Sequence, residues 1–498
     1  MKTINFFIGL AALFTFGVAS AQPSDNYSHQ ADSICNKVFS EWNLPGMAVV
    51  IIKDGKEMLL KGYGKSEYSA QGKEITPQTQ FVIASTTKAM TAALLATVVD
   101  KGVVKWNDTV INHLSDFELY DPWVTQNFLV KDIMVHKTGF NAYAADDLPH
   151  FGYGRDQLYT LLRHIQPTYS FRTKYAYNNA MYTVAAKIIE KYYNMSWDDA
   201  IANYLFKPLE MNSSTTGSKA YFTSEKLAKG HRHYKDGDSI KISLREDTQR
   251  GYAWLSAIAP AGFVISTAQD MGNWLKMHLR GGTFNGKTVI SKENHKFLIT
   301  PQTISGSDSV TLNNYAQGWT IEQGESGRLI HHTGLAYGYT AVVAFVPDLD
   351  MGIAVLTNAG NTTNPHMVIT REVIELLNGT DKKDWQKHYI DNFMKNSPRK
   401  PQEEKADTIA PKRLDLYKGK YSKRDFGTIT ISLKEEKLFF TLKESSYELT
   451  HKNANVFTMR VPGAGTVEVE FFAGTNVPIE ALTFNIGDPI GKFYKAPF

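Results

Sequence analysis

The sequence has 498 residues but one cysteine, Cys35, so it cannot form an internal disulfide. Stability must come from a hydrophobic core, and we expect Cys35 to pack in an early helix. Neither sign of charge predominates, because the formal net charge is only +4. Basic runs interleaved with aromatic residues are missing, so no nucleic-acid partner is expected.

Long apolar runs are rare too, and the one candidate lies near the start. Lys2 precedes an apolar stretch over residues 4–18, and Ala19-Ser20-Ala21 fits a small-residue cleavage site. The alternative is a membrane anchor, but the stretch is short for a span of about 20 residues. We therefore predict a signal peptide over residues 1–21, cleaved after Ala21, and a periplasmic or secreted protein without a transmembrane segment. Cys35 stands too far along the chain to carry a lipid anchor.

The apolar pattern predicts an α/β domain whose sheet uses strands from both ends of the chain. A helix is expected over residues 31–42, followed by a β-hairpin around Asp54-Gly55. Residues 81–279 read as mostly helical segments. Strands return over residues 328–357, and a helix over residues 367–377 closes this part.

The last part of the chain has a different pattern. Residues 395–412 are charged and contain three prolines, which predicts a linker. From Leu414 onward, short alternating runs are separated by turn residues. This pattern is typical of a small antiparallel barrel, predicted here over residues 413–498.

The stretch Ser85-Thr86-Thr87-Lys88 is a Ser-x-x-Lys at the start of an alanine-rich helix. Three residues of helix place Ser85 and Lys88 on one face. Ser85 would sit at the helix N-terminus, where free N–H groups favour negative charge, and Gly102 would end the helix. Residues 397–400 repeat the string in the linker, so the string alone does not identify a site.

A second element, Tyr177-Asn178-Asn179, precedes an amphipathic helix. A tyrosine near an activated serine could act as a base if a cation such as Lys88 lowered its pKa. Asn179 offers an amide donor for a substrate carbonyl. A similar string at residues 192–194 is interpreted as core aromatics followed by a helix-ending asparagine.

The third element is His332-Thr333-Gly334, which leads into the β-rich end of the domain. An edge strand offers unpaired backbone groups to a bound acyl chain. A backbone N–H there can complete an oxyanion hole, for which we expect Leu335 N–H together with Ser85 N–H.

These three elements, in this order, resemble the class C β-lactamase and D-alanyl-D-alanine peptidase family of serine hydrolases, a penicillin-binding-protein-like group. Shorter stretches agree at residues 206–215, 260–275 and 355–361. The resemblance covers roughly residues 30–390. It implies a β-lactamase-like α/β (α+β) domain over residues 22–394, with an antiparallel sheet flanked by helices and an all-helical region. The last part resembles the lipocalin-like barrel appended to some members.

The resemblance implies that Ser85 forms an acyl-enzyme and that Lys88 and Tyr177 transfer protons. Asn179 would hold the substrate amide. His332 takes the place of the lysine of true class C β-lactamases. A histidine has a pKa near ~6.5, so it carries less positive charge at neutral pH and should anchor a β-lactam carboxylate less well.

We therefore expect an exported serine hydrolase acting on a small ester, amide or peptide, as an esterase or a D-amino-acid-type peptidase. Three alternatives stay open: an acyltransferase that passes the acyl group to an alcohol or amine, a β-lactamase, and a non-catalytic binding or sensor protein. The aromatic loop over residues 140–154 hints at an apolar pocket mouth. Oligomerisation through the C-terminal domain also stays open.

Several other short sequence patterns resemble functional motifs, but we do not assign them to a site. Lys137-Thr138-Gly139 lies between Ser85 and Tyr177, so it fails by order and is interpreted as the end of a helix capped by Gly139. Ser24-Asp25-Asn26 precedes the nucleophile in a start expected to be disordered. Asp146-Asp147 is interpreted as solvated loop charge. The histidines at 231, 233, 331 and 332 lack a recognised ligand spacing, so we expect no metal and no cofactor.

Overall fold

The computed structural model describes residues 23–236, 239–245, 249–307, 312–324, 327–360, 364–380, 383–396, 409–462, 464–473, 478–485 and 490–495. An eight-stranded antiparallel sheet forms its centre, in the order β10-β11-β12-β13-β14-β15-β1-β2. The strands are β1 Gly46–Lys53, β2 Lys56–Gly64, β10 Thr303–Ser307, β11 Leu312–Tyr315, β12 Thr320–Gly324, β13 Gly327–Ala336, β14 Tyr339–Val346 and β15 Met351–Thr357. The N-terminal hairpin pairs with β15, so the sheet joins both ends of the domain as predicted.

Alternate residues of β1 point to opposite faces of this sheet, and each face has its own helical cover. Met47, Val49 and Ile51 lie in one hydrophobic cluster with residues of α1 (Pro23–Glu41) and α13 (Pro365–Asn378). Val50 and Ile52 lie in the other cluster, where α11 (Ala268–Leu279) packs on the sheet. α14 (Trp385–Asn396) packs on α13.

The first helix begins earlier than predicted. α1 starts at Pro23 rather than near residue 31, so the stretch from Ser24 to Asn26 is helical and the expected disorder there is wrong. Cys35 is buried in α1, as predicted. The predicted signal peptide lies outside the described residues, as does most of the predicted linker.

The region between the two halves of the sheet is mostly helical, as predicted. Its helices are α2 Thr87–Asp100, α3 Val110–His113, α4 Pro122–Asn127, α5 Arg155–Leu161, α6 Tyr182–Tyr193, α7 Trp197–Ile201, α8 Gly217–Thr223, α9 Gln249–Ala257, α10 Ala259–Gly262 and α12 Lys292–Leu298. Short helical turns are η1 Ala84–Thr86, η2 Val130–Asp132, η3 Leu148–Phe151, η4 Leu162–His164 and η5 Ala202–Phe206. Small strands are β3 Phe81–Val82, β4 Thr215–Thr216, β5 His231–Asp236, β6 Ser239–Leu244, β7 Val264–Ser266, β8 Thr283–Phe284, β9 Lys287–Thr288 and β16 Ala359–Gly360.

The segment that carries Lys137 differs from the prediction. In place of a helix ending at Gly139, the chain forms the single turn η2 and then irregular turns. Gly139 does have the positive φ expected of a cap, +96°. A Cβ added to Gly139 would lie 2.5 Å from the Tyr169 carbonyl oxygen, so the neighbouring loop leaves no room for a side chain at this position.

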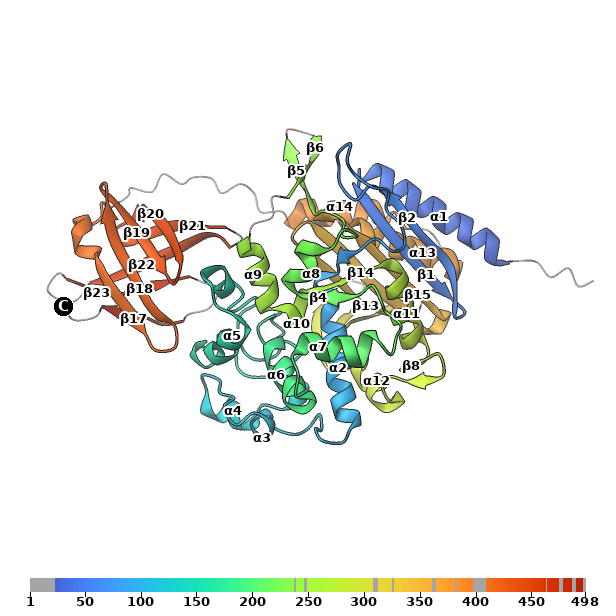
Figure 1. The fold of residues 1–498 in the computed structure, drawn as a ribbon, viewed down its shortest axis with the longest axis horizontal. Helices are drawn as coiled ribbons and strands as arrows, with labels where there is room; N and C mark the ends of the chain where they lie inside the picture. Colours follow the sequence, from blue (N-terminus) through green and yellow to red (C-terminus); the bar gives the residue numbers. More distant parts are fainter. Residues whose placement is uncertain are drawn as a thin grey trace, which may run out of the picture.

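The C-terminal part is a closed antiparallel barrel, as predicted. Its strands are β17 Gly419–Lys423, β18 Gly427–Lys434, β19 Lys437–Leu442, β20 Ser445–Asn453, β21 Val456–Val461, β22 Gly465–Ala473, β23 Ile479–Phe484 and β24 Phe493–Lys495, preceded by η7 Leu414–Tyr417. Buried side chains such as Phe440, Phe457 and Phe471 fill its interior. In Figure 1 the barrel lies at one end of the molecule beside α5 and α9, and α1 lies at the other end.

Candidate active site

Ser85 stands in the helical turn η1, directly before the buried helix α2. The preceding residue, Ala84, has a φ of +48°, a conformation that residues with a Cβ rarely adopt, and it turns the chain from β3 into the helix. α2 is buried from Thr87 to Val98, in agreement with its many alanines. It ends at Asp100, and Gly102 follows with a φ of +73°, as predicted.

Lys88 is fully buried and its Nζ has three oxygen neighbours. They are Ser85 Oγ at 3.2 Å, Asn179 Oδ1 at 2.6 Å and the Ala261 carbonyl oxygen at 2.9 Å. Burial lowers the pKa of Lys88, and the negative charge of Asp146 opposes this shift. A neutral amine has two N–H donors and one lone pair. Because the amide and carbonyl oxygens can only accept, the lone pair is left for the Ser85 hydroxyl.

Tyr177 lies beside Lys88 and Ser85. Lys88 Nζ lies 4.6 Å from the centre of its ring, and the Ser85 side chain acts to lower the pKa of its phenol. The condition under which Tyr177 could act as an ionised base, a pKa lowered by Lys88, is not met, since burial raises that pKa well above its ordinary value. Tyr177 is therefore a neutral phenol that can pass a proton on but is not itself an ionised base.

Asn179 is buried and connects Lys88 to a carboxylate. Its Oδ1 accepts from Lys88, while its Nδ2 donates to Asp146 Oδ2. The amide has a second N–H, which can donate to a substrate carbonyl. Asp146 is only 7% exposed, so the interpretation of Asp146-Asp147 as solvated charge is wrong for the first of the two. Burial raises the pKa of Asp146, and its contacts with Asn179 and Lys88 oppose this shift.

His332 is buried on β13, with its ring centre 6.3 Å from that of Tyr177. Its Nδ1 lies 2.6 Å from the Thr333 carbonyl oxygen, which can only accept, so Nδ1 carries the proton. Nε2 then accepts from the Tyr315 hydroxyl at 2.9 Å. Burial lowers the pKa of His332 to about 3, with the Lys88 charge acting in the same direction. With this pKa the ring carries no positive charge at neutral pH, whereas the sequence led us to expect only less positive charge than a lysine would carry.

The end of β13 forms an open edge beside Ser85. β12 pairs with β13 no further than His331, so residues 332–336 have β14 as their one strand partner among the described residues. A two-residue turn, Tyr337-Gly338 with positive φ at both positions, joins β13 to β14 and makes Ala336–Tyr339 a hydrogen-bonded pair. Since such pairs alternate, the N–H groups of Thr333 and Leu335 point away from β14, toward the open edge.

η1 packs directly on this edge. A Cβ added to Gly334 would lie 2.3 Å from the Ile83 carbonyl oxygen and 3.1 Å from Ser85 N, so the third position of His332-Thr333-Gly334 admits no side chain. Leu335 is 54% exposed, so its side chain lies on the surface beside this edge. The structure thus brings all eight predicted site residues to one place: Ser85, Lys88, Tyr177, Asn179, His332, Thr333, Gly334 and Leu335.

Sequence reasoning missed His136, which belongs to the same segment as Lys137. Its ring centre is 4.5 Å from that of Tyr177, and its Nδ1 accepts from Asn178 N at 3.0 Å. Burial lowers its pKa well below the ordinary value, with the Lys88 charge acting in the same direction. A histidine before an irregular turn has no local signature, so only the fold brings it to the site.

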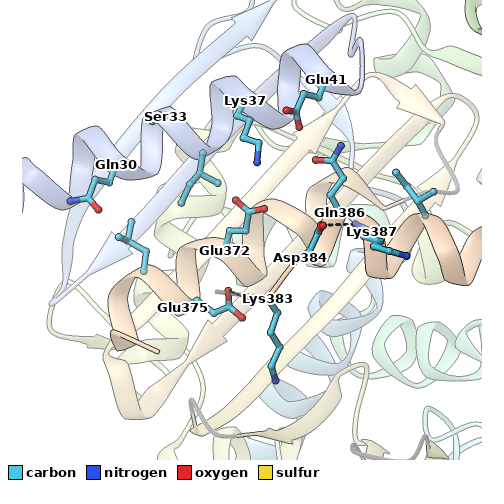
Figure 2. A pocket seen from close by; sticks show the side chains of 13 residues that line it. Gln30, Ser33, Lys37, Glu41, Glu372, Glu375, Lys383, Asp384, Gln386 and Lys387 are labelled. Atoms are coloured by element: carbon cyan, nitrogen blue, oxygen red, sulfur yellow. Dashed lines mark hydrogen bonds between the residues drawn. The ribbon is translucent and has the colours of Figure 1, made fainter. Parts of the chain in front are cut away.

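The histidine pairs do not assemble a metal centre in the described part of the chain, where no group of three His, Cys, Asp or Glu is placed to hold an ion. His231 instead accepts from Tyr68 N at 3.0 Å and contacts the Asn358 carbonyl oxygen at 3.0 Å. A cavity of about 830 Å³ lies between α1, α13 and α14, lined by lysines and carboxylates (Figure 2). The sheet separates it from Ser85. Of the helices described, none is long and apolar enough to cross a membrane.

The chain matches the family described as Beta-lactamase over residues 35–377 and the Domain of unknown function (DUF3471) over residues 403–489. It is similar to the Unguisins hydrolase ungD' of Aspergillus campestris, with 27% identity over 443 residues, 83% of this chain and 79% of that protein. It is also similar to Protein flp of Staphylococcus aureus strain MW2, with 23% identity over 69% of this chain and 66% of that protein.

Solved structures share the fold at low identity. The octameric penicillin-binding protein homologue of Pyrococcus abyssi has a TM-score of 0.60 and 19% identity, covering 92% of this chain and 98% of that chain. SurE with D-Leu has a TM-score of 0.57 and 17% identity, covering 95% of this chain and 100% of that chain.

Proposed function

Because the chain belongs to the β-lactamase family, we propose that it is an exported serine hydrolase that forms an acyl-enzyme on Ser85 from an ester or an amide. The observation that carries this proposal is the 3.2 Å separation of Lys88 Nζ and Ser85 Oγ at a lysine whose pKa is lowered by burial. A neutral amine at this distance can accept the proton of the attacking hydroxyl.

The proton path follows from the three side chains around Ser85. Neutral Lys88 accepts the hydroxyl proton while Ser85 Oγ bonds to the substrate carbonyl carbon. The carbonyl oxygen becomes an oxyanion that accepts from Ser85 N–H and Leu335 N–H. Tyr177 donates its proton to the leaving alcohol or amine and receives one from Lys88. Water then repeats the sequence and releases the acid.

The substrate class is an ester or an amide without a required carboxylate beside the reacting carbonyl. Neutral His332, held by Tyr315, supplies no fixed positive charge there. The names of the relatives favour hydrolysis and a substrate that contains a D-amino acid, because one relative is called an unguisins hydrolase and SurE was solved with D-Leu. We therefore place D-amino-acid-type peptidase and esterase activity ahead of acyl transfer to an alcohol or amine, and β-lactam hydrolysis after both.

Export belongs to the proposal because Lys2, the apolar stretch over residues 4–18 and Ala19-Ser20-Ala21 fit a cleaved signal. N-terminal sequencing of the mature protein tests this step. We expect Gln22 as its first residue.

A fluorophosphonate probe tests the nucleophile, since it labels an activated serine. We expect the wild-type chain to be labelled and Ser85→Ala to remain unlabelled. Ser397→Ala is the matched control, because Ser397 begins the second Ser-x-x-Lys of the sequence. An unlabelled wild type would overturn the proposal in favour of a binding or sensor protein.

A substrate panel separates the classes of reaction. It contains p-nitrophenyl esters, D- and L-amino acid amides and nitrocefin, each with and without an added alcohol or amine acceptor. We expect hydrolysis of esters or D-amino acid amides at rates above that of nitrocefin. Product that carries the acceptor in place of water would identify the acyltransferase instead.

A further inference from the structure

The loop of residues 143–153 joins the candidate active site to the barrel. At its first end it is hydrogen-bonded to the Tyr177-Asn178-Asn179 element three times. Tyr143 N donates to the Tyr177 carbonyl oxygen at 2.7 Å, and Asn178 Nδ2 donates to the Ala144 carbonyl oxygen at 3.0 Å. The third bond is that from Asn179 Nδ2 to Asp146.

At its other end the same loop enters the barrel. Phe151 is fully buried, and its ring centre lies 5.1 Å from that of Phe484, 5.8 Å from that of Tyr447 and 6.2 Å from that of Phe440. All three partners are buried barrel residues. The side chain of Phe151 therefore completes the aromatic packing of the barrel rather than that of its own domain.

Polar contacts fix the loop backbone on the barrel around this ring. Tyr447 Oη donates to the His150 carbonyl oxygen at 3.2 Å, and Lys443 Nζ donates to the Gly152 carbonyl oxygen at 2.8 Å. Tyr153 Oη donates to the Phe426 carbonyl oxygen at 2.6 Å. Four residues separate Phe151 from Asp146, and the turn η3 occupies all of positions 148 to 151. The segment between the contact of Asp146 with Asn179 and the contacts of Phe151 with the barrel is therefore short.

We propose that the barrel clamps the 143–153 loop and that Asp146, carried by this loop, is the positioning residue that holds Asn179 and Lys88 in their reactive arrangement. This proposal rests on the proposed function of Ser85 and Lys88. It assigns a role to the domain that matches DUF3471.

The chemistry of the two contacts explains how Asp146 acts through Asn179. A carboxylate can only accept, so it selects the NH2 end of the Asn179 amide and leaves Oδ1 directed at Lys88 Nζ. A flipped amide would present N–H groups to the amine and remove one of its acceptors. The Trp254 indole N–H donates to the Asp146 backbone carbonyl oxygen at 2.6 Å, which holds the residue from the side of α9.

Asp146 also acts on Lys88 by its charge. Burial disfavours the charged form of each group, and the negative charge of Asp146 raises the pKa of Lys88. Among the described residues, Asp146 Oδ1 has no hydrogen-bond partner. The carboxylate therefore sets the pH at which Lys88 becomes neutral.

Four variants of the full-length protein test the positioning role. Asp146→Ala removes the acceptor and should lower kcat about a hundredfold, the effect of misplacing a reacting group by about 1 Å. Asp146→Asn keeps an acceptor oxygen and should recover most of kcat, but it should move the acidic limb of the kcat/KM profile to lower pH by about one unit or more. Asp147→Asn is the matched control, with neither effect expected. Ser85→Ala gives the rate of any reaction that does not depend on Ser85.

Two further variants test the clamp. Phe151→Ala should reproduce the loss of kcat seen with Asp146→Ala. Phe117→Ala deletes an equally buried ring that packs on Phe128 within the helical region, so it should lower the melting temperature without that loss. If Phe151→Ala does not fold, Lys443→Ala, which removes the hydrogen bonds of Lys443 Nζ to the Gly152 carbonyl oxygen and to Gln157 Oε1, should give a smaller loss of the same kind.

The outcomes separate the two proposals. Wild-type kcat and an unmoved pH profile in the Asp146 variants would overturn the positioning role while fluorophosphonate labelling still supports Ser85. Equal losses in Phe117→Ala and Phe151→Ala would overturn the clamp. Absence of labelling in the wild type would instead overturn the proposed function itself.

Discussion

Gly334 lies so close to the Ser85 turn that a Cβ on it would stand 3.1 Å from Ser85 N and 2.3 Å from the Ile83 carbonyl oxygen. The strand edge and the nucleophile are therefore in backbone contact. Their separation sets the size of the space in which a substrate carbonyl can meet two N–H donors.

Gly334→Ala should lower kcat/KM by about a hundredfold, because the added methyl group forces the strand and the serine turn apart. The steady-state rate on the best ester of the panel measures the effect. Gly306→Ala is the control, since Gly306 lies on β10 of the same sheet with open space around it. Equal activity of both variants would mean that the edge takes no part in the reaction.

Lys88→Arg should lower kcat/KM on the order of a thousandfold, because a guanidinium cannot lose its proton and cannot act as a base. In the proposed mechanism the neutral amine of Lys88 is the active form. Activity should therefore rise with pH along an acidic limb far below the ordinary pKa of lysine. Lys101→Arg, at the end of the same helix over the Tyr193 ring, should leave the pH–rate profile unchanged.

His332→Lys should raise the rate on nitrocefin relative to that on a simple ester by about tenfold, equivalent to about 1.4 kcal/mol of ion pairing. The neutral imidazole offers no charge to a carboxylate, whereas an ammonium does. His332→Gln removes the ring without adding charge and should leave the ratio near that of the wild type. An unchanged ratio in His332→Lys would contradict this electrostatic account.

The protein should lose stability as the pH falls below about 6.5. Buried histidines with lowered pKa values are His136, His150, His278, His295, His332 and His366, with values of about 4 for His150 and His295 and about 3 for His332 and His366. Between these values and about 6.5 the unfolded chain binds more protons, so each group removes up to about 1.4 kcal/mol of stability per pH unit of acidification.

Calorimetry at pH 7 and pH 5 measures this loss as a fall in melting temperature. His366→Phe should reduce the difference in melting temperature between pH 7 and pH 5. Neither ring nitrogen of His366 has a hydrogen-bond partner among the described residues. His29→Gln changes an exposed histidine and should not narrow it. A melting temperature that stays constant between the two pH values would count against neutral buried histidines.

The parts of the fold that the sequence predicted are those with a local signal. The Ser85 helix, the Tyr177 element and β13 each combine a short motif with a helical or alternating pattern. Barrel strands such as β20 alternate buried and exposed residues over much of their length, and the string at residues 192–194 does end a helix, with Asn194 at a φ of +51°. Motif order excluded Lys137-Thr138-Gly139, whereas the duplicates at residues 397–400 and 192–194 were set apart by their places in the linker and at a helix end.

What the sequence did not predict depends on contacts between distant segments. We expected Asp146 to be solvated because no local sequence pattern shows that α9 and the barrel enclose its loop. The aromatic loop predicts a pocket mouth, but Phe151 and Tyr153 are buried against the barrel, while Tyr143 stays 56% exposed beside Tyr177. The raised pKa of Tyr177 likewise follows from burial among other tyrosines rather than from its neighbour Lys88.

The buried ring of Phe151 also bears on how the chain unfolds. It joins the barrel and the helical region in one continuous hydrophobic cluster, although the two family matches divide the chain between residues 377 and 403. The hydrophobic packing thus continues across the boundary between the two families. Removal of the barrel would expose an aromatic side chain and the backbone carbonyls that it now satisfies, so the two parts should melt in a single transition.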